Sequence, residues 1–241
     1  MEVFKMNEKW DELAKILKTS NNIVFFGGAG TSTESGIPDF RGKDGLYSRK
    51  YKGYDPEEIL HIDFFLQNRK IFNEFLEEKM NFKNIKPNKG HLALVKLEQM
   101  GKLKAVITQN IDNLHQDAGS INVLELHGNI SHFYCLACGK KEPKNFRCDC
   151  GGITRPPVTL YGENLDEEVT ELAISAIKKA DTLIVAGTSL TVYPAAYYIQ
   201  YFKGKNLVII NADETKYDQY ASLVIRDSFA QVMDYAVNKL K

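Results

Sequence analysis

The sequence predicts an α/β protein built on a doubly wound parallel sheet. Short, continuous apolar runs bounded by polar residues are typical of parallel strands that are buried on both faces. Amphipathic stretches separate these runs, and such alternation favours a sheet with helices on both sides. The expected strands are residues 22–27, 104–108, 181–187, 206–210 and, with a weaker pattern, 222–225. The expected crossover helices are residues 63–80, 91–100, 167–179, 194–202 and 229–240.

The length and charge of the chain favour a globular protein with no general affinity for polyanions. Its 241 residues correspond to one large domain, or to one domain with a small insertion, and can bury a substantial core. The chain has 31 Lys and Arg residues and 31 Asp and Glu residues, so its formal net charge is zero. We therefore expect no direct binding of nucleic acid and no attraction to a membrane surface.

The N-terminal segment predicts a helix and not a targeting peptide. Apolar residues between Trp10 and Leu17 follow helical spacing. The segment lacks the basic stretch, the long apolar stretch and the small-residue cleavage site of a signal peptide. No apolar run in the chain reaches the roughly 18 residues that a membrane span needs. We expect a cytoplasmic protein that acts as a monomer.

Polar and small residues follow each of the four clearest strands. The first strand leads into Gly27–Gly30, the second into Gln109–Asp112, the third into Gly187–Ser189 and the fourth into Asn211. The carboxyl ends of parallel strands lie at one edge of a sheet, where ligands bind in open α/β folds. The alternative is that these are ordinary loop residues, but four such loops at one edge favour a single ligand-binding crevice.

The first of these loops, "FFGGAGTSTESGIPDFRG", is suited to phosphate groups. Its glycines allow close backbone approach, and a helix N-terminus is expected near residues 32–35. The loop departs from the dehydrogenase fingerprint, because Thr33 occupies the third glycine position counted from Gly28. No second strand with an acidic end follows about 20 residues later. These departures argue against ordinary hydride transfer.

All four cysteines lie in one short polar segment, at positions 135, 138, 148 and 150. In an intracellular chain this favours metal binding over disulfides. Four thiolates complete the tetrahedral coordination of zinc and leave no open position, so the expected zinc is structural. The segment has few apolar residues, and metal binding would supply its folding energy. The alternatives are free structural thiols and a zinc ribbon that binds nucleic acid, although Lys140, Lys141, Lys144 and Arg147 make only a weak basic patch.

Five segments together resemble the sirtuin family of NAD-dependent protein lysine deacylases. They are "GAGTSTESGIPDFRG", "TQNIDNLHQDAG", "ELHG", the cysteine cluster and "GTSLTVYPAA", in this order along nearly the whole chain. "RPPVTLYGENL" looks like the substrate-side segment of the family, and the resemblance is to bacterial deacetylase-type members. The resemblance implies that NAD is consumed as a reactant: nicotinamide leaves, the acyl group moves to ADP-ribose and free lysine is released.

The resemblance also implies a division into two domains. A Rossmann-like NAD-binding domain would comprise residues 1–40, 84–127 and 158–241, and a small domain would comprise residues 41–83 and 128–157. The first insertion would be a helical module and the second a zinc-ribbon module. NAD and the acyl-lysine peptide would meet in the cleft between the two domains.

The resemblance assigns roles to individual residues of the cleft. His127 would be the general base for the 3′-hydroxyl of the nicotinamide ribose, which suits a group with a pKa near working pH. Asn110 and Asp112 would hold the nicotinamide end of NAD, although Asp112 could equally cap a helix. The other expected contacts of NAD are Gly28, Ala29, Gly30, Thr31, Ser32, Asp39, Phe40, Arg41, Gln109, Ile111, Gly187, Thr188, Ser189, Asn211 and Ile225.

Among these contacts, Arg41 would bind the phosphates in bidentate fashion, with a surface salt bridge as its alternative role. Phe40 would shield the ribose from water, and Asn211 would lie on the adenosine side. A second histidine of the motifs, His115, is expected to be structural. Two departures from the family are Thr31, where isoleucine is usual, and the Cys148-x-Cys150 pair, where many members have C-x-x-C.

The peptide is expected to pair by its backbone between residues 159–164 and the stretch near Val192, which gives affinity with little reading of sequence. The expected substrate contacts are Thr159, Tyr161, Gly162, Glu163 and Val192. A neutral acyl group is favoured, because residues 68–82 lack a Tyr-x-x-Arg pair and contain three glutamates. The alternatives to deacetylation are mono-ADP-ribosyl transfer or NAD hydrolysis on the same scaffold, and a non-enzymatic nucleotide sensor or zinc module.

Overall fold

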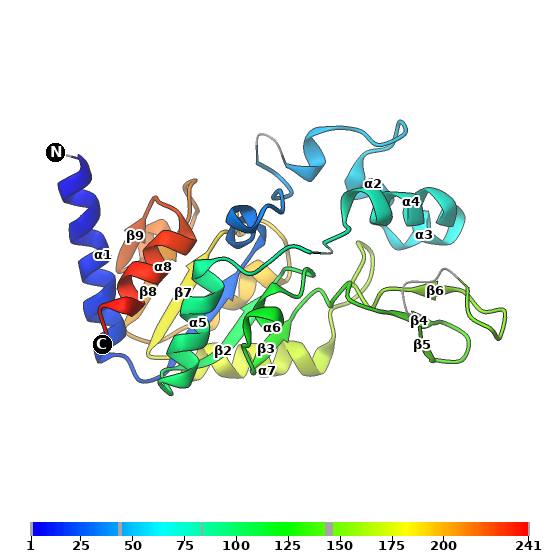
Figure 1. Cartoon of the computed structure of the whole chain (residues 1–241). Coiled ribbons are helices and arrows are strands. Elements are labelled where there is room, and N and C mark those ends of the chain that lie inside the picture. Colours follow the sequence, from blue (N-terminus) through cyan, green and yellow to red (C-terminus); the bar gives the residue numbers. More distant parts are fainter. Residues whose placement is uncertain (1, 43–44, 83, 143–146, 241) are drawn as a thin grey trace.

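The computed structural model describes residues 2–42, 45–82, 84–142 and 147–240. The described residues form a parallel six-stranded sheet in the order β3-β2-β1-β7-β8-β9 (Figure 1). Its strands are β1 (Ile23–Gly27), β2 (Leu103–Thr108), β3 (Val123–Glu125), β7 (Thr182–Ala186), β8 (Asn206–Ile210) and β9 (Leu223–Ile225). Among the described residues, no helix is long and apolar enough to cross a membrane.

The strand order reverses between β1 and β7, which are neighbours in the sheet. From β1 the chain adds β2 and β3 on one side, and later β7, β8 and β9 on the other. Gly27 at the end of β1 pairs with Thr108 of β2 and with Ala186 of β7. The loops after these three strands therefore begin side by side, and a reversal of this kind leaves a crevice outside the carboxyl ends.

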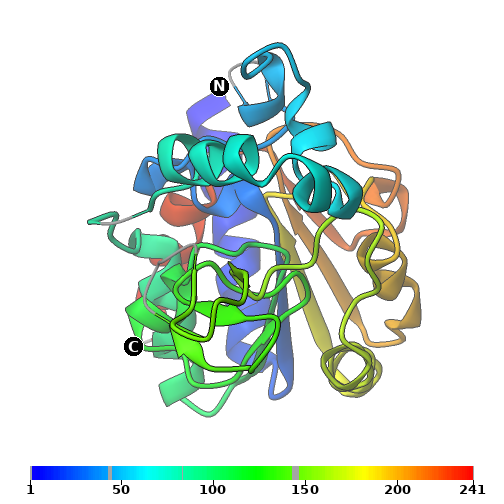
Figure 2. The same ribbon diagram turned by 90° about the vertical axis from the view of Figure 1, so that its right-hand side faces the viewer.

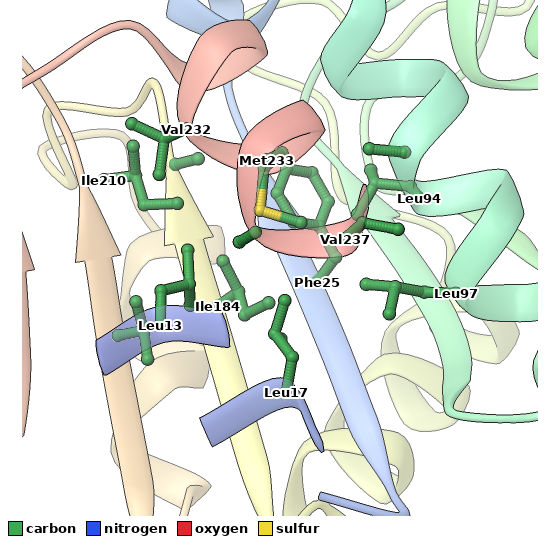
Figure 3. Close-up of a cluster of buried hydrophobic side chains, with 14 of the residues drawn as sticks. Leu13, Leu17, Phe25, Leu94, Leu97, Ile184, Ile210, Val232, Met233 and Val237 are labelled. Atoms are coloured by element: carbon green, nitrogen blue, oxygen red, sulfur yellow. The ribbon is translucent and has the colours of Figure 1, made fainter. Parts of the chain in front are cut away.

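Helices cover both faces of the sheet, which explains why the strands read as continuous apolar runs. Every residue of β1 is buried, with Phe25 in the core on one face and Phe26 in the core on the other. The first core is formed with α1 (Glu2–Thr19), α5 (Lys89–Gln99) and α8 (Phe229–Asn238), as Figure 3 shows. The second is formed with α7 (Glu167–Lys179) and the 3-10 helix η4 (Ala195–Tyr201).

A smaller body extends from the carboxyl edge of the sheet, on the right of Figure 1 and facing the viewer in Figure 2. It contains α2 (Pro56–Ile59), α3 (Ile62–Gln67), α4 (Arg69–Lys79) and an antiparallel sheet of β4 (Phe133–Cys135), β5 (Lys141–Glu142) and β6 (Thr154–Arg155). Phe65 and Phe72 of the helices share one core with Phe133 of β4. The two segments, about 60 residues apart in sequence, are thus packed together.

The remaining short elements lie in connections. They are η1 (Ala29–Thr31), η2 (Thr33–Ser35), η3 (Leu46–Ser48), α6 (Leu114–Ala118) and η5 (Asp218–Tyr220).

Two expected helices differ from the structure. Residues 63–80 form two helices, because Asn68 (φ −127°, ψ 43°) leaves the helical region between α3 and α4. Residues 195–201 form a 3-10 helix and not an α-helix. Its buried residues, Ala195, Ala196, Tyr198 and Ile199, repeat at a spacing of three, which is the period of a 3-10 helix. Amphipathic spacing alone does not separate these two periods over seven residues.

Candidate active site

A cleft of about 660 Å³ lies at the carboxyl edge of the main sheet. This volume lies within the range typical of small-molecule sites. The loops after β1, β2, β7 and β8 line one wall, and residues 158–163 line the other. The predicted residues in its lining are Ala29, Gly30, Asp39, Phe40, Arg41, Gln109, Asn110, Ile111, His127, Thr159, Tyr161, Gly162, Glu163, Gly187, Thr188, Ser189, Val192 and Asn211.

Five predicted residues are not in this lining. Ser32 and Asp112 line a small adjoining pocket of about 20 Å³, which also contacts Asn110 and Phe40. Gly28 and Thr31 belong to the cofactor loop, the segment 28–36, and are buried in it. Ile225 belongs to the core, and only its carbonyl approaches the site, where it accepts a hydrogen bond from the backbone N–H of Asn211 (3.1 Å).

The cofactor loop packs against the loop after β7. The N–H of Gly30 donates to the carbonyl of Gly187 at 2.8 Å, and a Cβ added to Gly30 would lie 2.7 Å from the Gly187 Cα. Gly187 itself has φ +59°, and its added Cβ would lie 2.3 Å from the Thr31 nitrogen. Any side chain at either position would separate the two loops. Close backbone contact is therefore why these two positions require glycine.

The expected helix start at residues 32–35 is wrong. The cofactor loop forms two single 3-10 turns, η1 and η2, and ends at Gly36, whose φ of +95° stops the second turn. The segment therefore directs no α-helix dipole into the cleft, because it forms 3-10 turns and not an α-helix.

A buried polar network lies at the floor of the site. Ser32 Oγ donates to Asp112 Oδ2 at 2.7 Å, and Asn110 Nδ2 donates to both Ser32 Oγ and Thr31 Oγ1 at 3.1 Å. Asp112 Oδ1 accepts from the N–H of Leu114 at 2.9 Å, so this carboxylate also caps the start of α6. Burial raises the pKa of Asp112, while the N–H of Leu114 and the Ser32 hydroxyl act in the opposite direction.

Thr31, which departs from the resembled family, takes part in the same network. Its Oγ1 donates to the carbonyl of Gly28 at 2.7 Å and accepts from Asn110. The hydroxyl therefore links the glycine turn to the buried amide of Asn110, which an isoleucine side chain cannot do.

His127 follows β3 and lines the cleft, and one of its ring nitrogens is hydrogen-bonded. Its Nδ1 lies 2.9 Å from the carbonyl oxygen of Gln109. A carbonyl only accepts hydrogen bonds, so Nδ1 carries the proton and Nε2 is the free base in the neutral ring. Burial lowers the pKa of His127, against the opposing hydrogen bond to Gln109. The ring is thus held neutral and oriented, as a general base requires.

His115, expected to be structural, lies in the core. It is fully buried and its ring packs 4.7 Å from that of His91 and 5.8 Å from that of Phe25. Neither of its ring nitrogens has a hydrogen-bond partner among the described residues. Burial lowers its pKa well below the usual value, so the ring stays neutral.

Arg41 makes the surface contact that was its alternative role. Its guanidinium donates to Glu57 Oε1 at 2.7 Å and to the Tyr161 hydroxyl at 3.3 Å. Exposed ion pairs of this kind contribute little to stability, at most about 1 kcal/mol. The side chain lines the cleft at the same time, so exchanging Glu57 for a phosphate would cost little.

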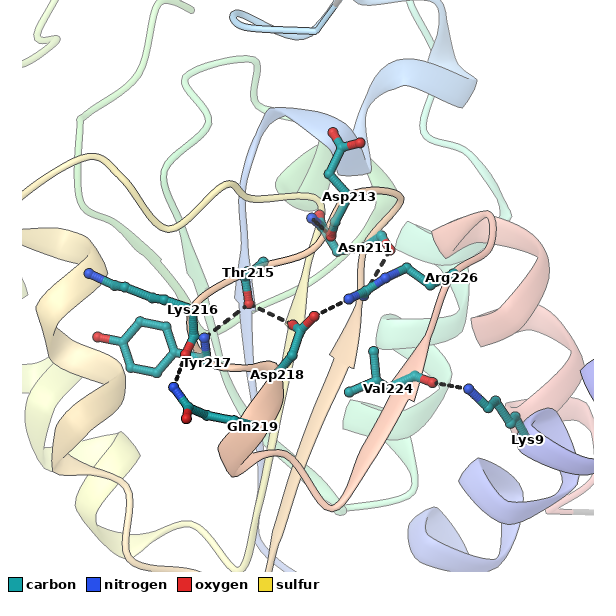
Figure 4. A network of polar contacts seen from close by, with 10 residues as sticks. All are labelled: Lys9, Asn211, Asp213, Thr215, Lys216, Tyr217, Asp218, Gln219, Val224 and Arg226. Atoms are coloured by element: carbon teal, nitrogen blue, oxygen red, sulfur yellow. Dashed lines mark hydrogen bonds and ion pairs between the residues drawn. The ribbon is translucent and has the colours of Figure 1, made fainter.

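The far end of the cleft, beyond β8, is exposed and held by a surface network (Figure 4). Asn211 Nδ2 donates to the carbonyl of Asp213 at 2.9 Å, and the Arg226 guanidinium donates to the carbonyl of Asn211 at 3.3 Å. Arg226 also forms an ion pair with Asp218, which accepts from the Thr215 hydroxyl at 2.7 Å. These contacts fix the course of the loop and leave Asp213 and Glu214 at the cleft.

The opposite wall is anchored by an ion pair. Arg155 donates to both carboxylate oxygens of Glu163 (2.7 and 2.8 Å) and to the carbonyl of Val158 (2.6 Å). Glu163 also accepts from the N–H of Leu160 at 2.8 Å. The carboxylate of Glu163, predicted as a substrate contact, is therefore engaged in shaping residues 158–163. The N–H of Thr159 donates to the carbonyl of His127 at 2.9 Å, which joins this wall to the histidine.

The four cysteine sulfurs fit a tetrahedral metal site. All lie within 4.8 Å of one another, with separations of 3.5 Å for 135–150, 3.7 Å for 138–148 and 3.6 Å for 138–150. A tetrahedron with zinc–sulfur bonds of about 2.3 Å has sulfurs about 3.8 Å apart. These distances exceed a disulfide bond of about 2.05 Å, and none of the four cysteines forms a disulfide. The backbone N–H of Cys138 lowers the pKa of Cys135 to about 7, whereas neighbouring thiols raise the pKa values of Cys148 and Cys150.

Several residues of the cleft were absent from the sequence-based set. They include Thr33, Glu34, Tyr47, Leu60, Met80, Val158, Leu160, Asp213, Glu214, Ser228 and Phe229. Asp213 and Glu214 follow a predicted strand end, so the same strand-end argument applies to them. Tyr47 and Met80 belong to the helical insertion, and no spacing in the sequence places them beside the sheet.

Comparison with known proteins supports the architecture. The Sir2 family model matches residues 28–194. A relative from Fusobacterium nucleatum named NAD-dependent protein deacetylase is 62% identical over 98% of this chain and 94% of its own length. One of the same name from Clostridium acetobutylicum is 52% identical over 95% of this chain and 98% of its own length.

Solved structures agree with these matches. A structure described as a basis for the mechanism and regulation of Sir2 enzymes has a TM-score of 0.87 and 40% identity, covering 98% of each chain. A Sir2 complex with a p53 peptide and NAD+ has a TM-score of 0.85 and 38% identity, covering 96% of this chain and 98% of that one. The fold, the cleft and the cysteine cluster have their counterpart in one family, and the chain belongs to the Sir2 family, the sirtuins.

Proposed function

We infer that this chain is an NAD-dependent protein lysine deacetylase, which removes acetyl groups from lysine and releases nicotinamide and O-acetyl-ADP-ribose. The observation that carries this inference is a single cleft that is lined by the cofactor loop, by His127 and by residues 158–163. Two reactants can therefore meet at one base. The relatives named NAD-dependent protein deacetylase, at up to 62% identity, and a Sir2 complex with a deacetylated p53 peptide and 3′-O-acetyl-ADP-ribose support it.

NAD would lie across the strand ends, with its pyrophosphate at Gly28–Ser32 and Arg41. Its nicotinamide would enter the small pocket beside Asp112, and its adenosine would reach the loop of Asn211. The buried amide and carboxylate at the nicotinamide end are held by hydrogen bonds before a ligand arrives. Positioning of this kind lowers the entropic part of the barrier.

His127 would act as the general base for a ribose hydroxyl. Its Nδ1 proton is held by the carbonyl of Gln109, so Nε2 is the atom that accepts the proton. The lowered pKa keeps Nε2 unprotonated at neutral pH. General bases typically contribute about 10²–10⁴-fold in rate.

The acetyl-lysine peptide would pair with residues 158–163 on one side and with the segment near Val192 on the other. Pairing through the backbone explains affinity for many sequences. Arg155 and Glu163 would shape this wall without touching the peptide, whereas Tyr161 and Gly162 line the cleft directly.

The cysteines would hold one structural Zn²⁺, since four thiolates leave no coordination position for a substrate. With the helical insertion they would form the small domain that closes one side of the cleft. We place the protein in the cytoplasm, where reducing conditions keep such thiols available, and expect it to act as a monomer.

The test is incubation of the purified protein with NAD and an acetyl-lysine peptide, with mass spectrometry of all products. We expect deacetylated peptide and O-acetyl-ADP-ribose in equal amounts. Free ADP-ribose with an intact acetyl-peptide would instead identify an NAD hydrolase, and a mass increase of the protein or peptide by ADP-ribose would identify a transferase.

A further inference from the structure

The internal backbone hydrogen bonds of the cofactor loop belong to two short 3-10 turns. Two bonds of 3.0 Å close each turn: the N–H groups of Thr31 and Ser32 donate to the carbonyls of Gly28 and Ala29, and those of Ser35 and Gly36 donate to the carbonyls of Ser32 and Thr33. Isolated turns of this type have poorer hydrogen-bond geometry than an α-helix. Neighbouring elements must therefore hold the loop in shape.

The first outside contact comes from the N-terminus of α5. Asn88 is the N-cap residue of this helix, and its Oδ1 accepts from the N–H groups of Gly90 (2.9 Å) and His91 (3.4 Å). The other end of the same amide, Nδ2, donates to the carbonyl of Thr31 at 2.8 Å. One side chain thus satisfies a helix terminus and fixes the middle of the cofactor loop.

The second contact joins the loop to the N-terminus of α8, and here a side chain of the loop reaches the helix. Glu34 Oε2 accepts from the Ser228 hydroxyl at 2.6 Å and from the N–H of Ala230 at 2.9 Å. A carboxylate at this end of a helix is also favoured by the helix dipole. Ser228 in turn accepts from the N–H of Gln231 at 3.1 Å, so Glu34 is joined to an already ordered cap.

We propose that Asn88 and Glu34 are positioning residues that hold the cofactor loop in its NAD-binding shape from the N-termini of two helices. Their contacts fall on either side of Ser32, the residue that anchors Asp112. Loss of either contact frees one turn of the loop while leaving both helices and the buried network in place. The inference rests on the proposed function only in naming NAD as the ligand.

Two pairs of variants separate positioning from folding. Asn88→Asp keeps an oxygen that caps α5 but removes the donor to Thr31, whereas Asn88→Ala removes both. Glu34→Gln keeps an acceptor for Ser228 and Ala230, whereas Glu34→Ala removes it. Asp166→Ala is the matched control, since it removes the N-cap of α7, where Asp166 accepts from Val169 N–H at 2.9 Å, without touching the loop.

The first measurement needs no ligand. Hydrogen exchange of the amides of residues 31–36 should quicken about tenfold in Asn88→Asp and Glu34→Ala, and stay at the wild-type rate in Glu34→Gln and Asp166→Ala. The second is calorimetric titration with NAD. We expect about tenfold weaker binding for Asn88→Asp, since a backbone acceptor loses its partner, and a smaller loss for Glu34→Ala. KM for the acetyl-peptide should change less than twofold.

Unchanged loop exchange in both Asn88→Asp and Glu34→Ala would overturn the proposal. So would exchange that quickens equally throughout the protein in parallel with a falling Tm, since both residues would then only support folding. A wild type that binds NAD but does not deacetylate would contradict the proposed function alone, because the loop exchange and the NAD titration would still decide the role of the two residues.

Discussion

The two ends of the cleft are built differently. At the nicotinamide end, Ser32, Asn110 and Asp112 are buried and each is hydrogen-bonded to another. At the proposed adenosine end, Ser189 and Asp213 are exposed, and the side-chain amide of Asn211 donates to one backbone carbonyl of its own loop, that of Asp213. Hydrogen bonds in buried surroundings are stronger, and leaving one unmade costs more. We therefore propose that the buried end carries the chemistry, while the exposed end contributes affinity.

The largest expected effect comes from removing the metal, because the metal would stabilise the small domain that closes one side of the cleft. Cys135→Ala should lose the bound zinc, measured as metal per chain by elemental analysis, and lower Tm by more than 10 °C, since structural zinc supplies several kcal/mol of folding energy. Asp149→Ala changes an exposed residue of the same segment and should leave both unchanged. A metal-free wild type with the same Tm as Cys135→Ala would show that the thiols hold no structural ion.

Lowering the pH should reduce the stability of the protein through His91, a buried residue of α5. Burial lowers the pKa of His91 to about 4. As the pH falls from about 6.5, the ordinary histidine pKa, to this value, His91 binds a proton in the unfolded chain but stays neutral in the folded protein. The free energy of unfolding therefore decreases as the pH falls. The difference of roughly 2.5 pKa units corresponds to about 3 kcal/mol at most.

Urea unfolding at pH 7.5 and pH 5 tests this loss. Wild type should be less stable at pH 5, and the decrease should be smaller in His91→Gln, which keeps an acceptor but does not titrate. Equal decreases in the two proteins would mean that His91 does not contribute.

Breaking the buried network should weaken both binding and turnover. In Ser32→Ala, Asp112 loses a donor and Asn110 loses an acceptor, and each unpaired buried group costs about 1–3 kcal/mol. We expect kcat/KM for NAD to fall about 10- to 100-fold, with weaker NAD binding by calorimetry. Ser189→Ala makes the same change at the exposed end and should cost less than threefold. Similar losses for the two serines would remove the distinction between the ends.

The smallest effect is expected at the adenosine end. Asn211→Ala removes a side chain whose contacts are exposed, so KM for NAD should rise a few-fold while kcat stays within twofold. Steady-state kinetics with saturating acetyl-peptide measures both constants. A large fall in kcat would show that this end also orders the reacting groups.

The sequence predicted the sheet and the strand-end loops because their signals are local. Residues 22–27 and 206–210 read as buried strands since both faces of the sheet are covered. The break at Asn68 and the 3-10 turns of the cofactor loop depend on backbone angles that apolar spacing does not report.

The polar contacts that support the site could not be predicted from the sequence for another reason: they join residues that are far apart along the chain. Asn88 and Thr31 are 57 positions apart, and Glu34 and Ser228 are 194 positions apart. Nothing in the local pattern of Arg155 or Glu163 shows that their charges meet in one ion pair. Such residues look like ordinary polar residues until the fold brings them together.

The most direct test of the central claim compares binding with chemistry in His127→Ala. Calorimetry with NAD and acetyl-peptide should give affinities close to those of wild type, because the loops remain. Deacetylation by mass spectrometry should fall about 10²–10⁴-fold, while exchange of labelled nicotinamide persists. His132→Ala, outside the cleft, serves as control. Deacetylation by His127→Ala at the wild-type rate would contradict the account, since the base would then lie elsewhere.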